Sequence, residues 1–333
     1  MGEFAPFCRG GIRVQDGFGR KIDYLRVSVT DRCNLRCFYC LPEEGVASSP
    51  QGDILSLEEL LELIRVATEN GIRRIRITGG EPLLRRGLVP LLAQVKALPG
   101  VEDLSLTTNG LLLEEGAAQL RRAGVDRLNF SLDTLRPERF REITRGGELG
   151  KVLRGIERAE REGFSPLKVN MVLMRQTADE IPEFLRLTRD RPLHVRFIEL
   201  MPVGAGSGKR AEHLPMAEAW RELEPLQPIP TKVEGGGPAT YYRIPGALGT
   251  VGFIGAVSNN FCGDCRRIRL GANGFLHQCL AEEGGIDLRG PLRQGISRKN
   301  LGKLFQQAVF AKPKEGTFRW EIDRCRAMSR IGG

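Results

Sequence analysis

The sequence lacks the long apolar runs and leader patterns that would direct it to a membrane. Its 333 residues contain no run near the roughly 18 apolar residues that a membrane span needs. The first residues lack a basic stretch followed by an apolar one, and Pro6 stands where a myristoylation motif needs Ser or Thr. We therefore expect a cytoplasmic protein with no membrane partner.

Long blocks of one charge are also missing, although the net charge is +9. The basic residues are spread along the chain, which weakens a nucleic-acid interpretation and leaves a small phosphorylated ligand open. Eight cysteines without a secretory signal argue against a disulfide framework. Six of them form two spaced groups, whereas Cys8 and Cys325 stand alone and are expected to be small buried hydrophobic residues.

Strand-like and helix-like segments alternate between residues 24 and 200. Short β-branched or apolar runs recur at 25–30, 73–78, 103–108, 127–132, 167–173 and 193–200. Helical patterns lie between them at 56–71, 86–98, 112–123, 148–163 and 179–190, and the first opens with a capping box, Ser56 with Glu59 three residues later. This alternation predicts a parallel sheet. Because polar or Gly-rich clusters occur near the strand ends, where barrel enzymes place their active sites, we predict the α/β class and a partial (β/α)6 barrel.

The character of the sequence changes after residue 203. Gly and Pro become frequent, and a short helix is predicted at 216–223 and a longer one at 297–310. Strand patterns at 266–270 and 275–279 flank a hairpin signal. We predict an N-terminal extension (1–23), the barrel (24–203) and a C-terminal α+β extension (204–333).

The first cysteine group, Cys33, Cys37 and Cys40, lies within eight residues on the loop after the first predicted strand. Three thiolates this close cannot pair off as disulfides, and a structural zinc site would need a fourth ligand. Three thiolates suit a [4Fe–4S] cluster with one open iron. That iron can chelate the amino and carboxylate groups of S-adenosylmethionine (SAM). A zinc knuckle remains the alternative.

The second group is Cys262, Cys265 and Cys279, and the predicted hairpin returns the third cysteine to the first two. A zinc site here would need a fourth ligand, for which His277 is the candidate. We favour a second cluster in the C-terminal extension, whose open iron can bind a substrate directly.

Arg267 and Arg269 lie between the second-group cysteines and project to the same face of a strand. Guanidinium forks on one face suit phosphate oxygens. The pair is therefore predicted to grip a polyphosphate, with an exposed basic edge as the alternative.

The first cysteine group, with an aromatic residue before its last cysteine, resembles the signature of the radical SAM superfamily. Gly79-Gly80-Glu81-Pro82, at the end of the second predicted strand, is similar to that superfamily's GGEP segment. With the second cysteine group, the arginine pair and the terminal Gly332-Gly333, the chain resembles the GTP 3′,8-cyclase family from about residue 24 to residue 333.

The resemblance implies a lyase that catalyses the first step of molybdenum cofactor biosynthesis. A hydrogen atom would leave ribose C3′ of GTP, and C3′ would then bond to C8 of guanine. The product would be (8S)-3′,8-cyclo-7,8-dihydroguanosine 5′-triphosphate. The implied cofactors are two [4Fe–4S] clusters and SAM.

The resemblance also implies a role for each matching residue. The cluster ligands would be Cys33, Cys37, Cys40, Cys262, Cys265 and Cys279. The SAM contacts would be Tyr39, Gly79, Gly80, Glu81, Ser131 and Met201. The residues around GTP would be Arg26, Arg76, Thr107, Lys168, Arg267, Ile268 and Arg269. Arg267 and Arg269 are also predicted to act in catalysis, and the Gly-Gly tail would reach into the barrel.

The implied partners are GTP, a downstream cyclic pyranopterin monophosphate synthase and a flavodoxin- or ferredoxin-type electron donor. A homodimer is also expected, and a nucleic-acid partner is not. Two other functions stay open. A different radical SAM enzyme with an auxiliary cluster, such as a peptide-modifying maturase, usually carries more C-terminal cysteines. A zinc- or cluster-bearing nucleic-acid module would show steeply salt-dependent binding and no cleavage of SAM.

Overall fold

The computed structural model describes residues 14–45, 50–223, 225–230, 237–282, 284–316, 318–320 and 328–331. Its strands are β1 (Tyr24–Ser28), β2 (Arg74–Thr78), β3 (Asp103–Thr108), β4 (Arg127–Ser131), β5 (Leu167–Leu173), β6 (Leu193–Glu199), β7 (Gln227–Pro228), β8 (Thr240–Arg243), β9 (Thr250–Ile254), β10 (Arg267–Leu270), β11 (Phe275–His277) and β12 (Ile286–Asp287). Its helices are α1 (Leu57–Glu69), α2 (Leu88–Lys96), α3 (Leu113–Arg122), α4 (Pro137–Thr144), α5 (Leu149–Arg161), α6 (Ile181–Arg186), α7 (Met216–Ala219), α8 (Arg289–Arg293) and α9 (Arg298–Phe310).

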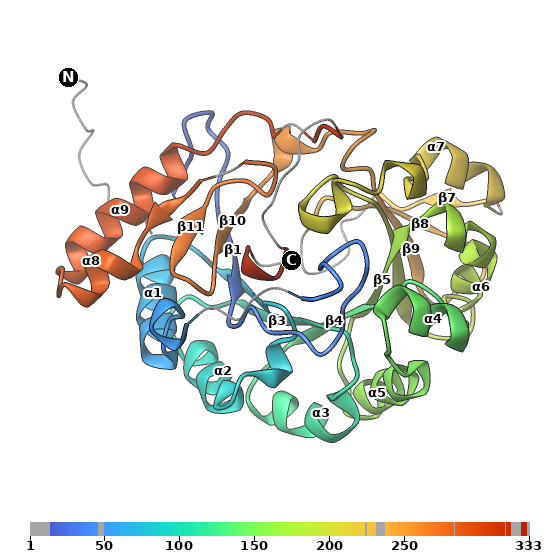
Figure 1. Cartoon of the computed structure of the whole chain (residues 1–333), viewed down its shortest axis with the longest axis horizontal. Helices are drawn as coiled ribbons and strands as arrows, with labels where there is room; N and C mark the ends of the chain where they lie inside the picture. The colour runs from blue at the N-terminus through green and yellow to red at the C-terminus, as the bar shows by residue number, and fades with distance from the viewer. Residues whose placement is uncertain are drawn as a thin grey trace.

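The strands form one curved sheet, with most of the helices on its outer side (Figure 1). The strand order is β12-β11-β10-β1-β2-β3-β4-β5-β6-β9-β8-β7. Strands β1 to β6 pair in parallel and in chain order, which confirms the predicted partial α/β barrel. The parallel run is longer than six strands, because β10 pairs in parallel with β1 and β9 with β6. The C-terminal region thus extends the barrel sheet at both edges.

Apolar stripes hold the helices against this sheet. Helix α5 buries one face at positions three or four residues apart: Leu149, Val152, Ile156 and Ala159. Helix α1 begins at the predicted capping box, where the Glu59 amide donates to Ser56 Oγ at 3.1 Å and the Ser56 amide donates to Glu59 Oε2 at 2.7 Å. The core lies between the outer helices and the strands, and the inner side of the sheet carries both polar and apolar residues.

The helices differ from the sequence expectation in four places, one of which is the short helix α8, which was not predicted. The helix predicted over 179–190 is a 3-10 turn, Arg175–Glu180, followed by α6. The helix predicted over 216–223 is only α7 and a following 3-10 turn. Helix α4 was not predicted, although Pro137 stands at its first turn, a position that suits proline.

The carboxyl ends of the parallel strands meet at the mouth of the barrel. The C-terminal 3-10 turn Met328–Arg330 also lies there (Figure 1), and Ser28 Oγ donates to Ser329 O at 3.0 Å. Cys8, Cys325 and the Gly332-Gly333 tail lie outside the described residues. Among the helices that the structure describes, none has the length and apolarity needed to cross a bilayer.

Candidate functional site

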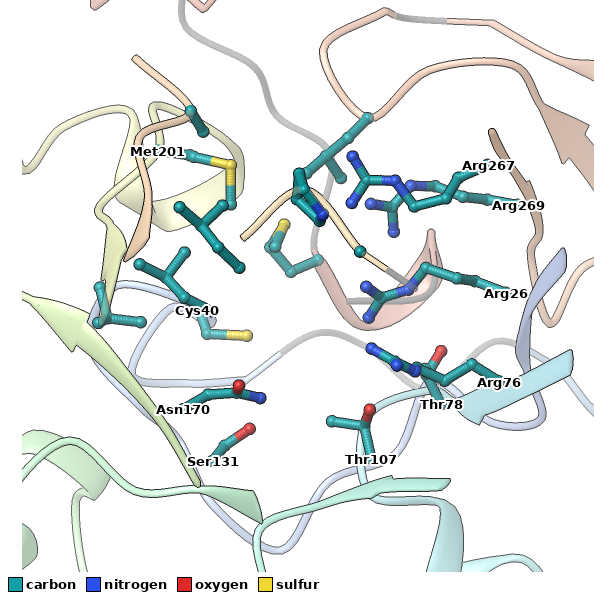
Figure 2. Close-up of a pocket in the computed structure, with 18 of the residues that line it drawn as sticks. Arg26, Cys40, Arg76, Thr78, Thr107, Ser131, Asn170, Met201, Arg267 and Arg269 are labelled. Carbon is teal, nitrogen blue, oxygen red and sulfur yellow. The ribbon is translucent and has the colours of Figure 1, made fainter. Parts of the chain in front are cut away.

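A cavity of about 300 Å³ opens at the mouth of the barrel and brings both cysteine groups together with a set of arginines. In Figure 2, Arg26, Arg76, Arg267 and Arg269 occupy one side, whereas Met201, Cys40, Ser131 and Asn170 occupy the other. The predicted site residues that line the cavity are Arg26, Cys33, Tyr39, Cys40, Arg76, Gly79, Gly80, Thr107, Ser131, Met201, Cys262, Cys265, Arg267, Arg269 and Cys279.

Four predicted site residues do not line this cavity: Cys37, Glu81, Lys168 and Ile268. Cys37 belongs to the first cysteine loop and packs against the core. Ile268 is fully buried on β10 opposite Leu25, on the other face of the strand from its two arginine neighbours. The roles predicted for these residues stay predictions.

The first cysteine loop is tied to its neighbours by backbone hydrogen bonds. The Cys40 amide donates to Cys37 O at 2.8 Å, and the Phe38 amide donates to Ile143 O at 3.1 Å. Burial raises the pKa of the Cys40 thiol to about 12, and the nearby Cys33 and Asp133 act in the same direction. Three thiolates in one buried loop repel one another, so this loop favours bound iron over free thiolates.

The Gly79-Gly80 turn lies directly against the cysteine loop. The Gly80 amide donates to Thr30 O and the Glu81 amide to Arg32 O, both at 2.8 Å. A Cβ at Gly80 would lie 2.1 Å from Arg32 O, so only glycine permits this approach. The turn therefore fixes the loop by backbone contact.

Glu81 turns away from the cavity and joins the ends of β2 and β3. It is 1% exposed and accepts hydrogen bonds from Thr108 Oγ1 at 2.9 Å and from the Asn109 amide at 2.8 Å. Burial raises the pKa of this carboxyl to about 7. In this arrangement Glu81 holds the mouth of the barrel together.

Tyr39 is fixed by a buried carboxylate that the sequence analysis did not single out. Its hydroxyl donates to Asp133 Oδ2 at 2.6 Å, and the Val172 amide donates to Asp133 Oδ1 at 2.8 Å. Burial raises the pKa of Asp133 to about 6. Asp133 lies two residues beyond Ser131, so the strand-end cluster there was a signal that could have identified it.

Two members of the second cysteine group, Cys262 and Cys279, lie against the loop that follows α9. The Gly316 amide donates to Cys262 Sγ at 3.4 Å, and a Cβ at Gly316 would lie 2.6 Å from Cys279 Sγ. Burial opposes ionisation of Cys265, but Arg267 and Lys312 outweigh it and lower the pKa of this thiol to about 6. Cys265 thus favours the thiolate, the form that binds metal.

His277, the candidate fourth zinc ligand, is engaged elsewhere. Its Nδ1 lies 2.5 Å from Gly284 O, and its ring stacks near Phe275. Within the described ranges, no three Cys, His, Asp or Glu side chains converge on a single-ion site. Because each cysteine of a cubane binds a different iron atom, a cluster does not require such convergence. The donor set fits two iron–sulfur clusters, one for each cysteine group.

Three arginines form a row across adjacent strands on the other side of the cavity. Parallel pairing aligns Arg269 of β10 with Arg26 of β1, and Arg26 with Arg76 of β2. Burial, together with the charge of the neighbouring Arg267, lowers the pKa of Arg269 to about 10. Burial and the other arginines also lower the pKa of Arg26. A row of cations held this close favours a polyanionic ligand.

Further polar atoms in the cavity wall have no hydrogen-bond partner among the described residues: Tyr24 OH, Thr107 Oγ1 and Asn170 Oδ1. Arg196 of β6 and Lys312 add two cations that the sequence analysis missed. Arg196 Nη2 donates to Asn129 Oδ1 at 2.8 Å. An arginine in the middle of a strand, between the apolar residues Val195 and Phe197, was the signal for Arg196. These donors and acceptors equip the cavity for a polar ligand as well as for a polyanion.

Two family models match the chain in tandem. Residues 27–188 match the Radical SAM superfamily and residues 193–318 match Molybdenum Cofactor Synthesis C. The GTP 3′,8-cyclase of Heliobacterium modesticaldum is 51% identical and is covered over 99% of its length by 96% of this chain. That of Pelotomaculum thermopropionicum is 50% identical, with 96% of this chain and all of that protein covered. The chain belongs to the GTP 3′,8-cyclase family.

The solved structures that are similar to this member of the GTP 3′,8-cyclase family support its fold and nothing further. SuiB of Streptococcus suis bound to S-adenosylmethionine has a TM-score of 0.58 at 17% identity, covering 82% of this chain and 62% of that one. SuiB of Streptococcus suis bound to its precursor peptide SuiA has a TM-score of 0.59 at 14% identity, covering 89% of this chain and 67% of that one. These structures support the radical SAM barrel and carry no argument about the substrate.

Proposed function

We propose that this enzyme converts GTP to (8S)-3′,8-cyclo-7,8-dihydroguanosine 5′-triphosphate, the first step of molybdenum cofactor biosynthesis. Relatives named GTP 3′,8-cyclase align with it over 96% of its length. The observation that carries the proposal is the arrangement of the cavity, in which a row of arginines faces the first cysteine loop and adjoins the second cysteine group.

The first cysteine loop holds one [4Fe–4S] cluster and orients SAM. Cys33, Cys37 and Cys40 are its ligands. The SAM contacts are Tyr39, Gly79, Gly80, Ser131 and Met201, which surround that loop in the cavity. The role proposed for Glu81 is indirect, because its carboxylate supports the strand ends beside the Gly-Gly turn.

The second cysteine group holds a second [4Fe–4S] cluster beside the substrate. The residues proposed to bind GTP are Arg26, Arg76, Thr107, Lys168, Arg267 and Arg269, with Ile268 supporting the arginines from the core side of β10. Because the row of arginines lies opposite the first cysteine loop, a triphosphate held by the row directs the rest of the nucleotide across the cavity.

When bound, the reduced first cluster and SAM supply the radical that removes a hydrogen atom from ribose C3′. GTP then forms the C3′–C8 bond and takes up one electron and one proton, so the product is an isomer of GTP. Methionine and 5′-deoxyadenosine are the co-products, and an external reductant supplies the electrons. Arg267 and Arg269 hold the triphosphate during these steps, because a misplaced substrate would let the radical react with protein.

The remaining predictions form part of the same proposal. A flavodoxin- or ferredoxin-type protein supplies the electrons, and a cyclic pyranopterin monophosphate synthase consumes the product. The enzyme works in the cytoplasm, where GTP and SAM are available, and as a homodimer. The barrel ends near residue 203 and the C-terminal extension follows, although its strands share the barrel sheet.

The test is anaerobic turnover of the iron-reconstituted protein with SAM, dithionite and GTP. Because the product has the mass of GTP, it must be separated by chromatography. We expect GTP to raise 5′-deoxyadenosine formation and to yield the isomer. If 5′-deoxyadenosine forms while GTP is not consumed, the assignment of GTP as the substrate is wrong. Absence of both, with two clusters loaded, would overturn the enzyme activity.

A further inference from the structure

A short N-terminal turn, residues 14–22, precedes β1 and holds one arginine in a fixed position. The Ile22 amide donates to Val14 O at 3.0 Å, which closes the turn. Asp16 is buried inside it, and Asp16 Oδ1 accepts from the Phe18 amide at 3.0 Å and the Arg20 amide at 2.9 Å. The conformation of the turn therefore determines where the Arg20 side chain points.

The Arg20 guanidinium joins three segments that are far apart in the sequence. Its Nε donates to Asp16 Oδ2 at 2.5 Å, and the side chain is only 9% exposed. Nη1 donates to Cys262 O at 2.6 Å and to Lys314 O at 2.8 Å, and Nη2 donates to Pro313 O at 2.5 Å. Asp16 balances the charge, so the fork is free to hold three neutral carbonyls.

These carbonyls belong to the backbone around the second cysteine group. The loop held at Pro313 and Lys314 continues to Gly316, whose amide donates to Cys262 Sγ. The same glycine leaves room beside Cys279 Sγ. A shift of this loop would therefore change the backbone donor to one ligand sulfur and the space beside another.

The loop is also held from its other end. Lys312 is 3% exposed, and its Nζ donates to Gln278 O at 2.7 Å, next to Cys279. Arg20 and Lys312 thus tie the 312–316 loop to both branches of the second cysteine group. Lys312 lines the cavity, whereas Arg20 belongs to the N-terminal turn and does not line it.

We propose that Arg20 is a positioning residue for the second cluster, and that the N-terminal turn is a structural part of that cluster's site. The inference rests on the proposed function, which assigns a cluster to Cys262, Cys265 and Cys279. Outer-shell partners of metal ligands set their orientation. Backbone hydrogen bonds to the sulfurs also help to set a cluster's reduction potential. By holding Gly316 against Cys262, Arg20 controls both properties.

The experiment compares Arg20→Gln, Arg20→Lys and Arg154→Gln with the wild-type protein. Arg154 is a matched control, because it is half exposed and pairs with Glu114 on the outer helices at 2.8 Å. Each anaerobically reconstituted protein is assayed for iron and sulfide, for iron release to a chelator, and for melting temperature. Formation of 5′-deoxyadenosine without GTP reports separately on the first cluster.

We expect Arg20→Gln to release the iron of one cluster about tenfold faster or more, the usual effect of losing an outer-shell partner. Formation of 5′-deoxyadenosine without GTP should survive while that iron is lost, which assigns the labile iron to the second cluster. Arg20→Lys keeps the charge but offers only one nitrogen, so its release rate should fall between those of the wild type and Arg20→Gln. Arg154→Gln should behave as wild type.

Wild-type iron content and release in Arg20→Gln would overturn the inference. Equal loss of both clusters in the two Arg20 variants, with a lowered melting temperature, would also overturn it, because Arg20 would then support only the general fold. The proposed function fails by a different result. That result is wild-type protein that has both clusters loaded but leaves GTP unchanged, and it does not depend on the iron-release rates of the variants.

Discussion

Replacing Lys168 by Met is expected to stabilise the GTP-free protein while weakening GTP binding. Lys168 lies on β5 with a side chain that is 1% exposed. Burial, reinforced by the charges of Arg196 and Arg76, lowers the pKa of its ammonium from 10.5 to about 6. Near pH 7.5 the folded protein therefore holds Lys168 mostly neutral, whereas the unfolded chain holds it charged.

The sign and size of the effect follow from this difference. Between about pH 6 and 10.5 the unfolded chain binds more protons at Lys168, so this residue's contribution to the free energy of unfolding rises with pH. At pH 7.5, about three pH units below the ordinary pKa, keeping the amine neutral costs about 4 kcal/mol. Met has a similar length and no charge, so we expect a gain of about 2–4 kcal/mol. The melting temperature should rise by a few degrees, and the gain should shrink toward pH 10.

The binding half of the prediction is measured by titration calorimetry with GTP. Lys168 does not line the cavity of the GTP-free protein, so its proposed role requires bound GTP to favour the charged form of its amine. Wild-type binding at pH 7.5 should then take up a proton, which is detected by comparing buffers of different ionisation enthalpy. Lys168→Met should lose that uptake and about tenfold or more in affinity. Lys96→Met is the control, because Lys96 pairs with Asp126 at the surface. A lower melting temperature in Lys168→Met, or unchanged affinity and proton uptake, would refute the reasoning.

Three further predictions concern the two sides of the cavity. In Gly80→Ala the new methyl would meet Arg32 O at 2.1 Å and push the cysteine loop away, so 5′-deoxyadenosine formation without GTP should fall about 100-fold. Asp133→Asn removes the charged acceptor of the Tyr39 hydroxyl, so the KM for SAM should rise about tenfold in steady-state assays. Arg196→Gln removes a buried cation from the cavity wall, so the KM for GTP should rise about tenfold while cleavage of SAM without GTP is retained.

Matched controls accompany these variants. Gly116→Ala places its methyl in open space on α3 and should retain wild-type activity. Arg154→Gln serves the same purpose for Arg196→Gln. Wild-type cleavage of SAM in Gly80→Ala would contradict the tight approach of the turn to the cysteine loop. An unchanged KM for SAM in Asp133→Asn, or for GTP in Arg196→Gln, would contradict the role that the prediction gives to that residue.

The six central strands and the cysteine groups could be predicted because their signals are local. Strand runs, the Ser56 capping box and the cysteine spacings each lie within a few residues of sequence. The pairing of β10 with β1 could not be predicted this way, because it joins Arg26 to Arg269 across most of the chain. Open sheet edges attract whichever strand the chain can bring back, and local patterns do not say which one that is.

Individual residues also divide into those that local patterns predict and those that depend on residues far away in the sequence. The family resemblance placed Ile268 around GTP, whereas the structure has it in the core, on the opposite face of β10 from Arg267 and Arg269, as alternation along a strand requires. Arg196 and Asp133 were missed because an isolated charge on or beside a strand has many explanations until its neighbours are known. Arg20 gave no sequence signal, since its partners are backbone carbonyls about 240 and 290 residues away.

The most direct test of the central claim uses GTP carrying deuterium at ribose C3′. The anaerobic enzyme is given this substrate with SAM and dithionite, and the 5′-deoxyadenosine is analysed by mass spectrometry. Our account predicts that the deuterium appears in 5′-deoxyadenosine, in amounts that match the cyclised isomer formed. Unlabelled 5′-deoxyadenosine accompanying consumption of GTP would contradict hydrogen removal at C3′, and with it the proposed reaction.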